Sequence, residues 1–64
     1  MLDATSYIVD TDGVICNQDN KVLMHMAGFR TACGFIRNYI TNIRGKSFTD
    51  DWIVMGSTRI YTVV

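Results

Sequence analysis

The chain of 64 residues contains no proline, only two cysteines and a single histidine. None of its apolar runs approaches the ~20 residues that a membrane-spanning helix requires. Two cysteines are too few for a disulfide-rich scaffold, and the separation of Cys16 from Cys33 does not match a metal site. The N-terminal segment carries Asp3 and lacks a basic stretch followed by an apolar one, so we expect no secretory signal. These absences favour a small cytoplasmic protein with two reduced thiols.

The arrangements of residues that usually carry catalysis are also missing. The sequence has no glycine-rich phosphate loop and no paired metal ligands, and no Ser/His/Asp set can be assembled around His25. We therefore expect no enzymatic activity, no cofactor and no bound metal.

One segment nevertheless resembles an enzyme motif. Tyr7 to Ile15, YIVDTDGVI, is similar to the first motif of haloacid-dehalogenase-like phosphatases, with Asp10 and Asp12 at the positions of the nucleophile and the acid/base. The resemblance would imply magnesium beside these aspartates. The family's remaining groups, however, are spread over a domain several times longer than this chain. The Asp-Gly step is explained locally as a hairpin turn, and we favour that interpretation.

The composition is that of one small globular domain, residues 1–64, with 48% hydrophobic and 19% charged residues. A chain of this length buries only ~60% of the surface that its unfolded form exposes, so its stability margin is small.

The distribution of turn residues and apolar runs predicts an α+β fold made of a β-hairpin, a helical middle and a C-terminal β-hairpin. Residues 6–16 form the first hairpin around Asp10–Gly13, and residues 17–20 form a polar turn. Lys21–Met26 is either a third strand or the start of a helix. Residues 46–51 form a polar loop, and 52–55 and 59–63 form the second hairpin around a turn at 56–58.

The stretch from Phe29 to Arg44 is helical, with Gly45 as its C-terminal cap, but it admits two interpretations. A single amphipathic helix would bury the apolar stripe, formed by Phe29, Cys33, Ile36, Ile40 and Ile43. A helix-turn-helix would instead bend at Gly34 and bury Phe35, with Ile40 and Ile43 anchoring the second helix. Because Gly28 and Gly34 both disfavour one uninterrupted helix, we lean towards two helices.

Phe29 to Val54 resembles the small helix-turn-helix modules of phage-encoded proteins and of homing-nuclease tails. The resemblance covers about two thirds of the chain and is carried by Phe29, Gly34, Phe35, Ile40, Ile43, Gly45, Lys46 and Trp52. It implies a phage or mobile-element protein of the host-cell cytoplasm that binds DNA with its second helix.

Charge is sorted along the chain although the net charge is zero. Residues 20–49 contain Lys21, Arg30, Arg37, Arg44 and Lys46 but no carboxylate, whereas all six aspartates lie outside this window. A neutral protein that sorts its charges in this way can present one positive face to a nucleic acid or to another acidic surface.

The candidate binding residues are Arg30, Arg37, Asn38, Thr41, Asn42, Arg44 and Lys46. Arg37, Asn38, Thr41 and Asn42 would read base edges in the major groove, because arginine pairs with guanine and asparagine with adenine. Arg30, Arg44 and Lys46 would contact phosphates. We expect double-stranded DNA as the partner, and the exposed hairpin edges would allow a homodimer to bind it. The alternatives are an inhibitor that docks the same face on an acidic host protein, and an oligomeric structural subunit that buries Phe35, Tyr39 and Trp52.

Overall fold

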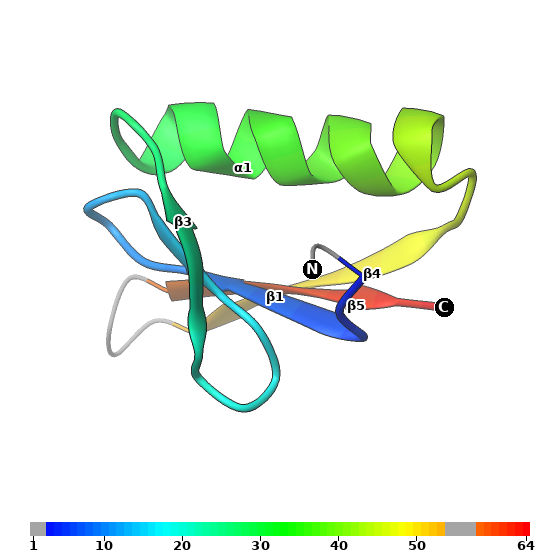
Figure 1. The fold of residues 1–64 in the computed structure, drawn as a ribbon, viewed down its shortest axis with the longest axis horizontal. Coiled ribbons are helices and arrows are strands. Elements are labelled where there is room, and N and C mark those ends of the chain that lie inside the picture. The colour runs from blue at the N-terminus through cyan, green and yellow to red at the C-terminus, as the bar shows by residue number, and fades with distance from the viewer. Residues whose placement is uncertain (1–2, 54–57) are drawn as a thin grey trace.

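The structure is a computed structural model that describes residues 3–53 and 58–64, and it has two layers, a sheet and a helix (Figure 1). The elements are β1 (Ser6–Val9), β2 (Val14–Cys16), β3 (Val22–His25), α1 (Phe29–Asn38), η1 (Tyr39–Ile43), β4 (Phe48–Ile53) and β5 (Thr58–Val63). The five strands form one antiparallel sheet in the order β3-β2-β1-β5-β4. The helical segment lies across one face of this sheet, so the predicted α+β class is confirmed, with one strand more than the two hairpins account for.

The first hairpin forms as predicted because its turn is closed by an aspartate. One carboxylate oxygen of Asp10 accepts hydrogen bonds from the backbone N–H groups of Asp12, at 2.9 Å, and of Val14, at 3.0 Å. Gly13 has φ +88°, and a Cβ placed there would lie 2.6 Å from the carbonyl oxygen of Met26. The turn therefore needs glycine both for its backbone conformation and for the close approach of the chain that leads from β3 to α1.

The ambiguous segment Lys21–Met26 is a strand, β3, and not the beginning of a helix. The side-chain oxygen of Asn17 accepts the backbone N–H groups of Asp19 and Lys21, and Asn20 adopts a left-handed φ of 62°. These local bonds turn the chain back beside β2, with which β3 then pairs in the sheet.

The helical middle is continuous through Gly34, so the interpretation with two helices is wrong. Gly34 lies inside α1, and no bend separates the residues before it from those after it. Ile36 is fully buried and Phe35 only half-buried, as the single amphipathic stripe requires. Glycine lowers helix propensity by only about 1 kcal/mol relative to alanine, and burial of the stripe over several turns exceeds that cost.

The end of the helix departs from both interpretations, because Ile43 is 67% exposed rather than buried. Residues Tyr39–Ile43 form a π-helical turn, in which the N–H of Arg44 donates to the carbonyl of Tyr39. The wider i→i+5 turn rotates Ile43 out of the apolar stripe. Gly45, with φ +66°, ends the helix as expected.

The second hairpin begins earlier than predicted, since β4 starts at Phe48 and four of the six residues of the expected polar loop over 46–51 belong to that strand. Phe48, Asp50 and Trp52 alternate with Thr49 and Asp51 along this edge strand. The predicted turn at 56–58 and the end of the predicted strand 52–55 lie largely outside the described residues.

The core lies between the helix and the inner face of the sheet. It consists of Ala4, Tyr7, Val9, Ile15, Ala32, Cys33, Ile36, Ile40 and Tyr61. On the opposite face of the sheet, Ile8, Cys16 and Ile60 form a half-buried row, and Val22 at its end is 60% exposed. A two-layer fold of this size covers one face of its sheet and leaves the other open.

Candidate nucleic-acid interface

Strand β5, which lies between β1 and the edge strand β4, places an arginine beneath the helix. Arg59 pairs with Trp52 on β4 and with Val9 on β1, and it shares a sheet face with the buried Tyr61 two residues later. Its guanidinium carbon lies 4.8 Å from the centre of the Trp52 ring, and its Nε lies 3.2 Å from Asp50. The ring and the carboxylate therefore hold the Arg59 side chain under α1.

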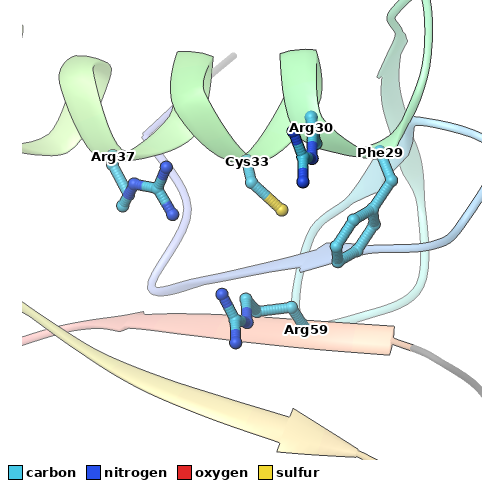
Figure 2. Close-up of a pocket in the computed structure, with 5 residues that line it drawn as sticks. All are labelled: Phe29, Arg30, Cys33, Arg37 and Arg59. Atoms are coloured by element: carbon cyan, nitrogen blue, oxygen red, sulfur yellow. The ribbon is translucent and has the colours of Figure 1, made fainter.

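Arg59 faces two further arginines across a recess of about 430 Å³ that is lined by Phe29, Arg30, Cys33, Arg37 and Arg59. Figure 2 shows the side chains from α1 pointing down towards the sheet, while Arg59 extends from β5 to meet them. We call these five residues the arginine pocket. Residues 30, 33 and 37 line one flank of α1 because they are spaced by three and four along the helix.

Arg37 is positioned by the core tyrosine of β5. Its Nη1 donates to the hydroxyl oxygen of Tyr61 at 3.1 Å, although Arg37 itself stays exposed. Burial raises the pKa of Tyr61, a hydrogen bond with Cys33 adds to the rise, and Arg59 offsets part of it. Tyr61 is therefore neutral at physiological pH and offers its hydroxyl oxygen to Arg37 from the core.

The positive charge of the pocket is only partly neutralised. Within residues 3–53 and 58–64, Asp50 is the carboxylate paired with Arg59, while Arg30 and Arg37 have no carboxylate within ion-pair distance. The pocket and Asp50 together carry two net positive charges. Guanidinium groups so arranged are suited to phosphate, because each offers planar pairs of donors.

The Nε atom of Arg59 is buried and lies 3.2 Å from Asp50, although no acceptor among the described residues is aligned with it for a hydrogen bond. Because this atom has no exposed surface, it anchors the side chain of Arg59 and does not itself offer a donor to a ligand in the recess.

The structure places Arg44, predicted as a phosphate contact, in a structural role. Its Nη1 donates to the carbonyl of Ala4 at 2.7 Å and to the hydroxyl of Tyr7 at 2.9 Å, and Nε lies 3.8 Å from Asp3. Its side chain is only 16% exposed. Arg44 thus attaches the end of the helix to the segment before β1. It is not one of the residues that line the arginine pocket.

The predicted base-reading residues separate into two groups. Asn38, Thr41 and Asn42 are exposed on the helical segment, and the side-chain amide of Asn42 donates to that of Asn38 at 2.5 Å. Arg37 points instead to the sheet side, with Arg30. Lys46 is exposed in the loop after the helix. One helix therefore offers a polar amide face and, beside it, an arginine flank.

Sequence reasoning missed Arg59 because it lies in a predicted hairpin outside the basic window. The signal that could have found it is the period of two in β5, which puts Arg59 on the same face as Tyr61 and Val63. A charged residue on the inward face of a strand needs a partner or a ligand.

The described part of the chain contains no group of three or more His, Cys, Asp or Glu side chains that could hold a metal ion. Among those same residues, no helix has the length and apolar character needed to cross a membrane. No protein family model, no curated protein and no solved structure matches the chain.

Proposed function

We propose that this protein binds double-stranded DNA through the arginine flank of α1 together with Arg59 of β5. Arg30, Arg37 and Arg59 would contact backbone phosphates. The observation that carries the proposal is the convergence of these three guanidinium groups on one pocket with a single paired carboxylate, Asp50. Segregation of charge supports it, since all residues from 20 to 49 lack carboxylates and the helix lies within that window. Phosphate contacts of this kind provide most of the affinity and fix the orientation on the duplex.

The exposed amide face adds a route to sequence preference. Asn38, Thr41 and Asn42 lie on the solvent side of a helix that no other described element covers. Asparagine can pair bidentately with adenine in the major groove, after the hydrogen bond between Asn38 and Asn42 opens. The phosphate contacts would then set the register at which this face meets the bases.

The experiment is an anisotropy titration of a short fluorescent duplex at several salt concentrations. Three or four phosphate contacts predict a slope of log affinity against log salt of about −3. The double variant Arg30→Gln/Arg37→Gln should reduce the magnitude of that slope by about 2, at ~0.9 per contact. Lys21→Gln is the matched control, because it removes one charge beside β3, at the opposite edge of the sheet from β4.

A second pair of variants separates base reading from phosphate binding. Asn38→Ala/Thr41→Ala should weaken discrimination among duplex sequences and leave the salt slope unchanged. Absence of duplex binding by the unaltered protein at low salt would refute the proposal. The same positive flank would then point to an acidic protein surface as the partner.

A further inference from the structure

The arginine pocket, which on a duplex would lie against backbone phosphates, also has the shape of a site that can enclose one phosphate group. Its three guanidinium groups come from two elements, α1 and β5, and face one another across a recess. An internal phosphate of a duplex is flanked by sugars on both sides and presents two free oxygens on a convex backbone. A terminal phosphate presents three oxygens and can enter a recess.

We propose that the arginine pocket binds the terminal phosphate of a nucleotide, a phosphomonoester, with the nucleoside packed at the Phe29 end. The proposal deepens the DNA-binding function and rests on it where the nucleotide is the 5′ end of a duplex. A free mononucleotide carries the same chemistry and would enter the same pocket.

Charge matching favours a monoester over a diester. The pocket with Asp50 carries two net positive charges, and a phosphomonoester carries roughly −1.5 to −2 at neutral pH. An internal phosphodiester carries a single negative charge and would leave the pocket positive.

The size and the walls of the pocket favour a nucleotide over inorganic phosphate. A recess of about 430 Å³ falls in the range of small-molecule sites, which is far more than one phosphate occupies. Phe29 and Cys33 supply apolar wall beside the arginines. The Phe29 ring is held edge-on to Trp52, with centroids 5.7 Å apart, so it offers a fixed aromatic surface to a base.

The first arm of the test compares two blunt duplexes of identical sequence, one with 5′-phosphates and one with 5′-hydroxyls, by isothermal titration calorimetry. We expect the 5′-phosphorylated duplex to bind at least about tenfold more tightly, because the terminal phosphate makes charge-assisted bonds that the hydroxyl cannot replace. Arg30→Gln and Arg37→Gln should each abolish most of this preference, whereas Lys21→Gln should keep it. Arg30 is exposed on α1, so its variant is expected to fold.

The second arm titrates deoxyadenosine 5′-monophosphate and deoxyadenosine while the emission of Trp52 is followed. Trp52 is the only tryptophan and contacts both Arg59 and Phe29, so occupation of the pocket should change its fluorescence. The monophosphate should produce a saturable change that deoxyadenosine does not.

The outcomes separate the two proposals. Equal affinity for phosphorylated and hydroxyl ends, together with no response to the monophosphate, overturns the pocket assignment while DNA binding stands. A phosphate preference that survives both arginine variants also overturns it. A response to the monophosphate without binding of either duplex supports the pocket as a mononucleotide site and removes the DNA-binding function.

Discussion

Replacing Gly34 by alanine should stabilise the protein, since Gly34 lies in the interior of a continuous helix. A Cβ built at this position meets no atom within 4 Å, so the new methyl group causes no clash. Alanine is favoured over glycine in a helix interior by about 0.8–1.0 kcal/mol. For a domain of this length, 1 kcal/mol corresponds to a rise in Tm of roughly 4–8 °C. Thermal unfolding followed by far-ultraviolet circular dichroism measures it directly.

A graded series makes the Gly34 experiment specific. Gly34→Ser should give about half of the gain, because serine lies between glycine and alanine in helix propensity. Urea unfolding should show the same order of midpoints with an unchanged slope. A lower Tm for Gly34→Ala would refute the reasoning, because a chain that bends at Gly34 would be strained by a side chain there.

Three further outcomes follow from the packing. Gly13→Ala should lower the free energy of unfolding by more than about 1–2 kcal/mol, since φ is +88° and the Cβ would meet the Met26 carbonyl at 2.6 Å; urea unfolding measures the loss. Arg44→Met should cost about 1–3 kcal/mol in the same assay, because the Tyr7 hydroxyl and the Ala4 carbonyl each lose the hydrogen bond donated by the guanidinium; an unchanged midpoint would contradict the structural role of Arg44. Burial raises the native pKa of Tyr61 above its ordinary value of about 10, so its stabilisation is complete below about pH 10 and is lost as pH rises through the native pKa. Stability measured against pH should therefore fall less steeply above pH 10 in Tyr61→Phe.

The local parts of the fold were predictable where one short-range signal acted without competition. The Asp10–Gly13 turn fixes its hairpin through bonds between neighbouring residues, and the sequence contains all of them. Lys21–Met26 was compatible with a third strand and with the start of a helix, and only its pairing with β2 decides between them.

The errors in the helix have different causes. Gly34 was given too much weight, because the penalty for one glycine is small compared with burial of Cys33, Ile36 and Ile40. The exposure of Ile43 could not be predicted from a period of 3.6, since a π-helical turn changes the period itself.

The candidate site could be only half predicted. Arg30 and Arg37 followed from their spacing along one helix flank. Arg59 reaches them through the pairing of β5 with β1 and β4, which joins residues far apart in sequence. The first half of β4 was predicted as a polar loop because it contains two adjacent aspartates. Asp50 is compatible with a strand here because it pairs with Arg59 of the neighbouring β5.

Strands β1 and β5, which are far apart in the sequence, pair with each other in the interior of the sheet, where Tyr7 lies opposite Tyr61. A chain that has folded only as far as β4 holds the three strands β3, β2 and β1 and a separate β4, because β5 is the strand that joins them. Closure of the sheet therefore waits for pairing between residues 7 and 61, and deletion of β5 should leave β4 without a neighbouring strand. Such long-range closure slows folding compared with a sheet built from consecutive hairpins.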